Sequence, residues 1–349
     1  MNEITQDDLT IAITIQHPAH VHFFKHIISE LNLMGHDVHV FVRESDVNIS
    51  LLDFYDIPYI KLANEPRSSV DLFKTQLTYE YNLLKEARKI SPDIFIAEAG
   101  VAAAHISALV GAEYQLFINN EHATLENHLS MPFASDIYVP SCFYSNPRFS
   151  VTRYNSYYPL AYTHPDWFQP SPAVFDHIPI DREEPFAILR LVSWNAAHDV
   201  GQNGIKDVKY LISKLEESGI RVLISSEGAL PSSLKSYQMS IPPHRLHDLL
   251  YYADIYVGEG GMTAAESALL GTPSVFINSI DLGYLNELEN RYELVTQISP
   301  DVNSDTIART IIKLLTENKE SVWSKRRRRI LDEKEDMTAL ALSHIIGND

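Results

Sequence analysis

Cysteine is nearly absent from this sequence. Cys142 is the only cysteine among 349 residues, so an intramolecular disulfide and a cysteine-based metal site are both excluded. A single free cysteine is most often a small buried apolar residue. The fold must therefore be stabilised by its apolar core.

Long apolar runs are also missing. No window approaches the roughly 18 apolar residues that a membrane-spanning helix needs. The first residues, MNEITQDDLTIAITIQ, have no basic segment ahead of an apolar one, which argues against a signal peptide. We therefore expect a cytoplasmic protein with no transmembrane segment.

Positive charge is scarce. The chain has 28 Lys and Arg against 46 Asp and Glu, a formal net charge of −18. Such a surface repels a nucleic-acid backbone, so no nucleic-acid partner is expected. An anionic nucleotide would need a local site made of backbone N–H groups, a helix terminus or a few cationic side chains.

The pattern of the N-terminal half indicates an α/β fold. Short apolar runs such as LTIAITI, DVHVFVR and DIFIAE alternate with segments of helical spacing. Strands joined by helices in this way predict a parallel, doubly wound sheet. A chain of 349 residues fits two such domains.

The alternation breaks at 164–185, which holds five prolines, and restarts at FAILRLVS. We predict an N-terminal acceptor-side domain over 1–163, a linker over 164–185, a nucleotide-binding domain over 186–335 and a C-terminal helix over 336–349. Two Rossmann-like halves give a cleft at the carboxyl ends of the strands, where ligands bind.

A glycine turn in the second half points to a phosphate. In DIYVGEGGMTAAE, an apolar strand runs into Gly260 and Gly261, which permit close approach of a ligand to the backbone. A helix starting at Met262 or Thr263 would present free N–H groups to an anion. Glu266 could accept hydrogen bonds from a ribose diol, or it could simply favour the helix dipole.

The same stretch resembles a known signature. LLYYADIYVGEGGMTAAESALLGTP is similar to the nucleotide-sugar motif of GT-B glycosyltransferases, especially the MurG type. The resemblance implies that Glu266 binds the ribose hydroxyls. It also implies that the backbone from Gly260 through Gly261 and Met262 to Thr263 lies along the diphosphate, with Ile241 to His244 bordering the base.

The first βαβ segment resembles that group as well. Its loop reads Pro18-Ala19-His20 where the family has Gly-Gly-His, so His20 takes the place of the family's histidine. Inverting sugar transfer needs a base for the acceptor hydroxyl, which suits a histidine. His17 and His22 are alternatives. His22 and His26 share a helical face at i, i+4, but there is no obvious third ligand, so we expect no metal site.

Two further loops carry candidate residues. Glu121 and His122 follow an apolar strand, where they could bind an acceptor, act as an acid/base pair or only form a turn. In LRLVSWNAAHD, Arg190 or Ser193 could hold a diphosphate oxygen, and Trp194 could line a sugar or base. The alternative is that Arg190 pairs with an acid and Trp194 packs in the core.

The basic run KRRRR, 325–329, lies in a helical pattern. It is either a solvated helix face with i, i+4 ion pairs or a patch for an anionic lipid surface. The second interpretation predicts peripheral membrane contact if the acceptor is lipid-linked.

Together, NNEHA, SWNAAHD and GEGGMT most resemble a GT-B-like family known as domain of unknown function 354, related to MurG-type transferases and UDP-N-acetylglucosamine 2-epimerases. The resemblance implies two Rossmann-like domains but supplies no substrate. Our first interpretation is transfer of a sugar from a nucleotide-sugar donor, expected to be UDP-linked, without a metal or cofactor, to an unknown acceptor for which a glycan or a lipid-linked group is a candidate. One alternative is a 2-epimerase, although SWNAAHD and EAGVAA replace that family's His-Arg-x-Glu-Asn and Gly-Asp-Thr motifs. The other is a non-catalytic nucleotide-sugar-binding protein.

Overall fold

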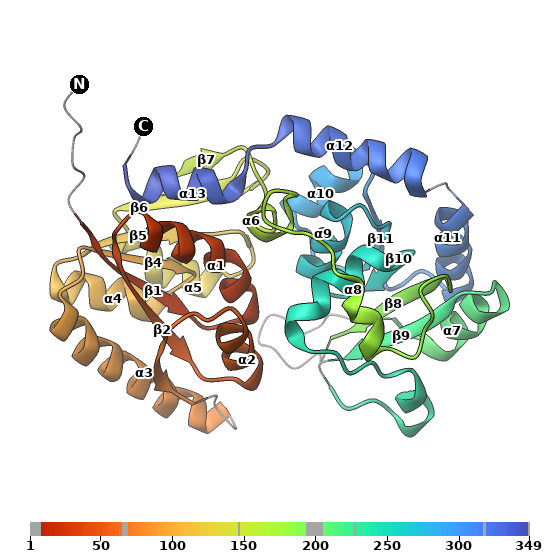
Figure 1. Ribbon diagram of the computed structural model, residues 1–349, viewed down its shortest axis with the longest axis horizontal. Coiled ribbons are helices and arrows are strands. Elements are labelled where there is room, and N and C mark those ends of the chain that lie inside the picture. Colours follow the sequence, from red (N-terminus) through yellow and green to blue (C-terminus); the bar gives the residue numbers. More distant parts are fainter. Residues whose placement is uncertain are drawn as a thin grey trace. The chain divides into compact units, whose positions relative to one another are not determined.

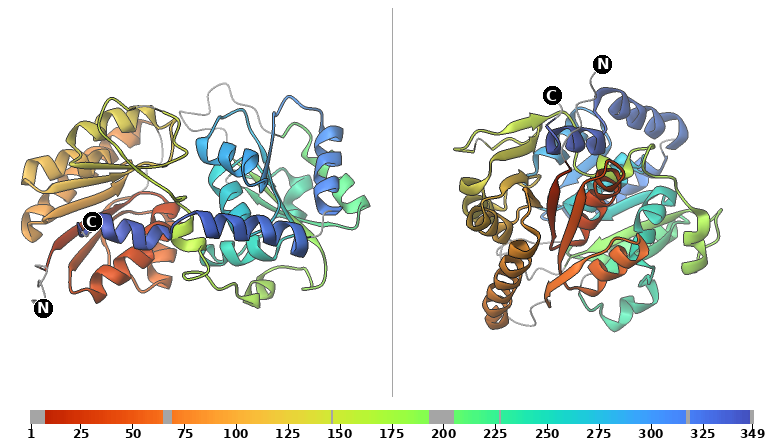
Figure 2. Two further views of the ribbon diagram at one scale, coloured as in Figure 1. Left: turned by 90° about the horizontal axis from the view of Figure 1, so that it is seen from above. Right: turned by 60° about the vertical axis from the view of Figure 1, so that its left-hand side comes forward.

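The computed structural model describes residues 8–64, 69–145, 147–192, 205–226, 228–316 and 319–347. The chain forms two compact units, each an α/β body (Figures 1 and 2). Unit 1 comprises Met1–Tyr162 and Asp336–Asp349, and unit 2 comprises Thr163–Glu335. The predicted α/β fold with two parallel sheets is confirmed.

Unit 1 is built on a seven-stranded parallel sheet in the order β3-β2-β1-β4-β5-β6-β7. Its strands are β1 Thr10–Ile15, β2 Asp37–Arg43, β3 Ile60–Ala63, β4 Ile94–Glu98, β5 Glu113–Phe117, β6 Asp136–Pro140 and β7 Thr152–Tyr154. From Ile11 to Ile15 the central strand β1 is buried throughout. A strand covered on both faces needs a continuous apolar run, which explains the sequence of β1.

The helices of unit 1 lie around the sheet (Figure 2). They are α1 Pro18–Leu33, α2 Asp46–Phe54, α3 Ser69–Ile90, α4 Val101–Val110, α5 Thr124–Ser130, followed by the 3-10 turn η1 Met131–Phe133, then α6 Leu160–Thr163 and α13 Met337–Ile345. His17 caps α1 by accepting the N–H of Ala19, and Pro18 takes the first helical position. Proline suits that position because its missing N–H would be unpaired there anyway.

The C-terminal helix α13 is part of unit 1 and packs against α1 (Figure 1). The Thr338 hydroxyl donates to the carbonyl of Ala161 at 2.9 Å, and the ring of His344 stacks on Tyr138 at 4.6 Å. Met337, Ala341 and Ile345 are almost fully buried. The end of the chain therefore completes the core formed near its start.

Unit 2 has a five-stranded parallel sheet in the order β12-β11-β10-β8-β9. Its strands are β8 Phe186–Leu191, β9 Arg221–Ser226, β10 Ile255–Gly258, β11 Ser274–Ile277 and β12 Val295–Ile298. Its α-helices are α7 Val208–Glu217, α8 Leu246–Tyr252, α9 Gly261–Leu269, α10 Gly283–Asn290, α11 Ser304–Thr316 and α12 Ser324–Glu333. Its shorter turns are η2 Pro172–His177, η3 Ser232–Tyr237, η4 Pro243–Arg245 and η5 Lys319–Trp323.

The segment predicted as a linker, 164–185, lies in unit 2 and includes η2. The backbone N–H of Ser171 donates to Oδ1 of Asp248 on α8 at 2.8 Å. The five prolines of this segment disrupt the helical and strand patterns in its sequence. The segment nevertheless packs against α8. This packing distinguishes it from a free linker.

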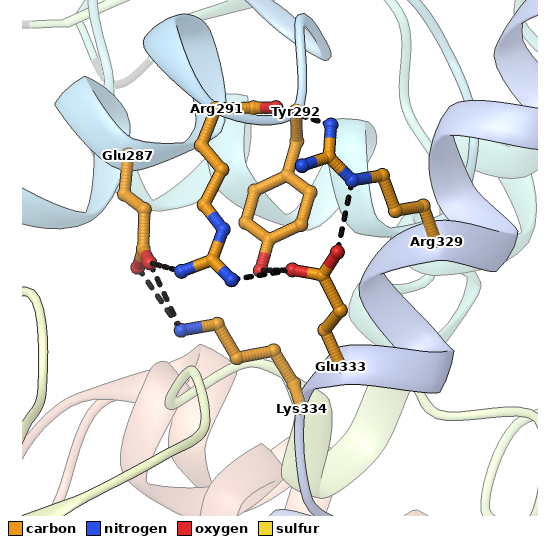
Figure 3. Close-up of polar contacts among 6 residues, drawn as sticks. All are labelled: Glu287, Arg291, Tyr292, Arg329, Glu333 and Lys334. Atoms are coloured by element: carbon orange, nitrogen blue, oxygen red, sulfur yellow. Dashed lines mark hydrogen bonds and ion pairs between the residues drawn. The ribbon is translucent and has the colours of Figure 1, made fainter.

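A polar network fastens the end of α12 to α10 (Figure 3). Glu333 receives hydrogen bonds from Arg291 at 2.6 Å, Tyr292 at 3.0 Å and Arg329 at 2.9 Å. Next to it, the buried ammonium of Lys334 lies 3.1 Å from both carboxylate oxygens of Glu287. Several charges sharing one network contribute more than an isolated surface pair.

Much of the basic run on α12 has partners inside unit 2. Arg326 pairs with Glu293 at 2.7 Å, and Nε of Arg327 donates to the carbonyl of Leu269, at the end of α9, at 2.8 Å. Arg329 also donates to the carbonyl of Arg291. These contacts favour the interpretation of KRRRR as a helix face engaged in local pairing.

Each sheet has one topological switch point, where the strand order reverses. In unit 1 it lies between β1 and β4, and in unit 2 between β8 and β10. Ligands of doubly wound sheets bind beyond the carboxyl ends of the strands at such points. No described helix is long and apolar enough to cross a bilayer.

Candidate functional site

The glycine turn of unit 2 lies at the switch point of its sheet. Gly258 at the end of β10 pairs in register with Arg190 on β8, and α9 begins three residues later. The helix starts at Gly261, one or two residues ahead of the predicted start at Met262 or Thr263, with Gly260 as its N-cap. The N–H groups of its first turn have no acceptor within the helix, so they can receive an anion.

Packing requires glycine at two of the three glycine positions of this turn. A Cβ at Gly258 would lie 2.4 Å from the Tyr256 hydroxyl, and one at Gly261 would lie 2.5 Å from Cδ1 of Leu282. A Cβ at Gly260 would meet nothing closer than 3.6 Å, and the φ of −92° there suits any residue. Packing thus explains glycine at 258 and 261 but leaves glycine at 260 unexplained.

Arg190 lies beside that turn. Its Nη1 donates to the Ser225 hydroxyl at 2.9 Å, and its Nε is the atom 3.6 Å from the position that a Cβ at Gly260 would take. The guanidinium therefore borders the N-terminus of α9, where a diphosphate would need a counter-charge. The sequence named Arg190 as a candidate to hold a diphosphate oxygen, and that role stays a prediction.

Glu259 is a residue that sequence reasoning missed. Its buried carboxylate accepts the backbone N–H of Val192 at 2.9 Å and that of Ile205 at 2.7 Å. Through these two hydrogen bonds, Glu259 connects the glycine turn to the residue that follows β8 and to the segment that precedes α7. Ser193 and Trp194 lie outside the described residues. No signal in the sequence separates Glu259 from an ordinary turn residue.

Glu266 lies in the second turn of α9 and is buried. Its Oε1 is 3.3 Å from Nε2 of His247 on α8. Glu266 also raises the pKa of the Tyr256 hydroxyl, although burial is the larger cause, and that hydroxyl donates to the carbonyl of Gly260 at 3.2 Å. The carboxylate predicted to bind ribose thus belongs to the same cluster as the turn, together with a histidine that the sequence did not indicate.

In unit 1, the switch point brings His20 and Glu98 together. His20 lies in the first turn of α1, and Glu98 ends β4. Nε2 of His20 is 3.2 Å from Oε2 of Glu98, and its Nδ1 accepts the backbone N–H of Gln16 at 3.4 Å. Both side chains are largely buried. A carboxylate beside the predicted base was not foreseen.

Burial disfavours the charged form of both side chains. Desolvation lowers the pKa of His20 to about 3, and the positive form of His17 adds to the effect. Desolvation raises the pKa of Glu98 to about 7; Glu126 adds to this and a hydrogen bond with the Tyr158 hydroxyl opposes it. Because both groups resist ionisation, their contact below about pH 7 joins neutral partners and is not a salt bridge.

The turn after Glu98 is strained. Ala99 has a φ of +46°, a left-handed conformation that is costly for a residue with a Cβ. Gly100 cannot be replaced without movement, because a Cβ there would lie 2.5 Å from Cβ of Ala97. Strain of this kind next to a buried carboxylate is typical of functional sites.

The loop after β5 holds the other predicted residues of unit 1. Oε1 of the buried Glu121 accepts the backbone N–H of Tyr144 at 3.4 Å, and the exposed His122 has its Nε2 3.3 Å from the Tyr144 hydroxyl. The N–H of His122 donates to Oδ1 of Asn120 at 2.8 Å. Tyr144 therefore links Glu121 and His122, and the sequence did not single it out.

The other histidines near His20 have structural positions. His17 caps α1, and the ring of the buried His22 lies 5.4 Å from that of Tyr162. Burial lowers the pKa of His26 to about 4. No cluster of three candidate ligand atoms among the described residues includes any of these histidines.

Comparison with known proteins supports the predicted relationship. The profile of the family described as "Protein of unknown function (DUF354)" matches residues 9–151, which lie in unit 1. An uncharacterized protein of Methanocaldococcus jannaschii is 21% identical over 294 residues, covering 77% of this chain and 81% of its own. The resemblance to this family predicted from the sequence is confirmed in that region.

Solved structures with the same fold cover nearly the whole chain. A putative UDP-N-acetylglucosamine 2-epimerase from Listeria monocytogenes matches with a TM-score of 0.71 and 11% identity, covering 98% of each chain. The spinosyn forosaminyltransferase SpnP matches with a TM-score of 0.65 and 14% identity, covering 97% of this chain and 99% of its own. The fold is therefore GT-B-like, with two Rossmann-like domains, as the sequence predicted.

Proposed function

We propose that this protein is a glycosyltransferase that moves a sugar from a UDP-linked donor to an acceptor hydroxyl without a metal ion. Unit 2 holds the donor and unit 1 supplies the base. The observation that carries the proposal is Gly260, a glycine that the fold does not need, located beside Arg190 at the N-terminus of α9.

The donor site follows from the chemistry of a diphosphate. The positive end of the α9 dipole and its unpaired N–H groups face the anion, and Arg190 adds a full charge. A Cβ at residue 260 would keep the ligand from the backbone. Glu266 accepts from the ribose hydroxyls, and hydrogen bonds to a charged group contribute roughly 1.5–3 kcal/mol.

The acceptor side depends on His20. Because its pKa is lowered to about 3, the imidazole is unprotonated at neutral pH and can receive a proton. Nε2 faces Glu98, so Nδ1 is the atom that takes the proton from the acceptor hydroxyl, giving up its long contact with Gln16. Ionised Glu98 then stabilises the imidazolium that forms.

Gly260→Ala is the decisive test of the donor site. We expect thermal stability within about 0.5 kcal/mol of wild type, because the added Cβ fits, while affinity for UDP falls at least tenfold. Gly261→Ala is the contrasting variant, since its Cβ clashes with Leu282, and we expect it to lower stability. Calorimetric titration with UDP and thermal unfolding of both variants give the comparison.

Unchanged UDP affinity in Gly260→Ala would exclude the turn as the diphosphate site. Turnover separates the remaining interpretations. UDP release that needs an added acceptor marks a transferase, whereas conversion of UDP-N-acetylglucosamine alone to N-acetylmannosamine marks an epimerase. UDP binding without either reaction marks a binding protein.

His20→Ala should keep UDP binding, and its rate of sugar transfer should fall roughly 10²–10⁴-fold.

A further inference from the structure

The contact between His247 and Glu266 has a consequence for which nucleotides the donor site accepts. The two side chains are 3% and 6% exposed, and Nε2 of the imidazole lies 3.3 Å from Oε1 of the carboxylate. A buried carboxylate needs polar partners. A buried Glu and His pair is seldom more stabilising than apolar side chains of similar size, so its presence calls for a role beyond stability.

His247 is held in place by its neighbours. The next residue, Asp248, accepts the backbone N–H of Ser171 at 2.8 Å and a guanidinium N–H of Arg245 at 2.9 Å. The imidazole also meets the ring of Phe168 edge-on, with 6.4 Å between centroids. The first turn of α8 is therefore fixed on both sides, and the imidazole can hold another side chain in a defined position.

Glu266 needs such support because of what it would bind. Accepting hydrogen bonds from two vicinal hydroxyls requires both carboxylate oxygens to be aimed, and small misplacements of a binding group are costly. Glu266 reaches the site from the second turn of α9, whose neighbouring residues Ala264, Ala265 and Ala268 are too small to brace it. From α8, His247 brings a polar group to within 3.3 Å of Oε1 of Glu266.

We propose that His247 is a positioning residue that orients Glu266 toward the 2′- and 3′-hydroxyls of the nucleotide, and so makes the site prefer ribo- over 2′-deoxyribonucleoside diphosphates. The proposal rests on the proposed function, since it assumes a nucleoside diphosphate at α9. A site built to hydrogen-bond a hydroxyl discriminates against the analogue that lacks it, because its own polar groups are then left unpaired.

Calorimetric titration with UDP, 2′-deoxy-UDP and inorganic pyrophosphate tests this role. The proteins are wild type, His247→Leu, which removes the polar contact, and His247→Gln, whose amide keeps a polar group beside Glu266. We expect wild type to bind UDP at least tenfold more tightly than 2′-deoxy-UDP. In His247→Leu, UDP affinity should fall about tenfold while 2′-deoxy-UDP and pyrophosphate stay within about twofold, and His247→Gln should recover most of the preference.

A merely structural His247 gives a different pattern. If His247→Leu weakens all three ligands by the same factor and His247→Gln does not restore them, the positioning role is wrong. Equal affinity of wild type for UDP and 2′-deoxy-UDP overturns it too, while leaving the donor site of the proposed function intact. Failure of wild type to bind either nucleotide would instead overturn the proposed function, and this proposal with it.

Discussion

The chemistry of single residues is set here by burial more than by charge pairing. His20 and Glu98 face each other at the switch point of unit 1, yet desolvation disfavours the charged form of both. With Glu98 protonated, His20 is a weak base. Once Glu98 ionises, its negative charge favours the imidazolium and strengthens the base. The protonation state of the carboxyl therefore controls the proposed catalysis.

This control gives a prediction for pH. Transfer activity should rise with pH through about 7, the pKa of Glu98, with the low-pH limb reporting this carboxyl and not a free histidine. In Glu98→Gln that limb should vanish and kcat should fall by roughly 10- to 100-fold, because the imidazolium loses its charged partner. Steady-state rates from pH 5 to 9 measure both effects, and UDP affinity should be unaffected.

The stability of the folded protein should fall as pH rises, which is opposite to the predicted change in activity. A folded pKa of about 7 against an ordinary 4.5 means that folding binds a proton, so stability is lost as pH rises from 4.5 through 7. The full loss is at most about 3 kcal/mol. Glu98→Gln should therefore raise the melting temperature at pH 8 and change it little at pH 4. A melting temperature of the variant below wild type at pH 8 would contradict this account.

Residues of the site differed in how far the sequence could reveal them. Gly260, Gly261 and Glu266 lie within nine residues of one another, so a contiguous motif predicted them. Glu98 lies 78 positions from His20, and only the pairing of β1 with β4 brings them together. The sequence signal for Glu98 was that it is a carboxylate at the end of an apolar strand. His247 had none, since its role depends on how α8 packs on α9.

Elements were more predictable than contacts. The apolar runs that became β1, β2, β8 and β10 are buried on both faces, so their composition alone identifies strands. Two strands went unpredicted. With three residues, β7 is too short to show a period, and β12 is only partly buried after Val295, so it lacks the apolar run that marks β10. The start of α9 could not be placed from the sequence, because its N-cap is Gly260, which has no capping side chain to mark the first turn.

At the same scale, α12 supports the far end of α9. Nε of Arg327 donates to the last carbonyl of that helix, and the absence of a Cβ at Gly271, which would lie 3.0 Å from Cδ of Arg327, leaves room for the arginine. We expect Arg327→Ala to lower stability by about 1–3 kcal/mol, because a helix-end carbonyl loses a charged donor. Affinity for UDP should be unchanged in the folded protein, since the N-terminus of α9 is not touched. Chemical denaturation and titration measure the two quantities.

Arg328 is the matched control, as it is exposed on the same helix. Arg328→Ala should change stability by less than about 0.5 kcal/mol. The pair also tests the lipid interpretation of the basic run. If both variants lose binding to vesicles of anionic lipid that wild type binds, the run is a membrane patch after all. Equal stability of the two variants would remove the capping role of Arg327.

At the level of the whole molecule, the chain leaves unit 1 at Tyr162 and returns to it at Asp336. The helical pattern near the C-terminus could be recognised from the sequence, but its partner could not, because the pattern of a helix does not say which core it completes. In the structure, Gln115 on β5 donates to the carbonyl of Ile345 at 3.4 Å, joining positions 230 residues apart. Unit 1 is thus built from two separate segments of the chain, whereas unit 2 is one continuous segment.

Removal of residues 336–349 should therefore weaken unit 1 and spare unit 2. The truncation strips Met337, Ala341, Leu342 and Ile345 from the core, and burying a large apolar side chain contributes about 1.5–3 kcal/mol. We expect hydrogen exchange to accelerate in α1 and β6 while the amides of β10 and α9 keep their protection. UDP, which the proposed function assigns to unit 2, should still bind within about threefold of wild type. Loss of protection in both units together would show instead that they unfold as one cooperative body, and that the C-terminal helix stabilises the whole chain.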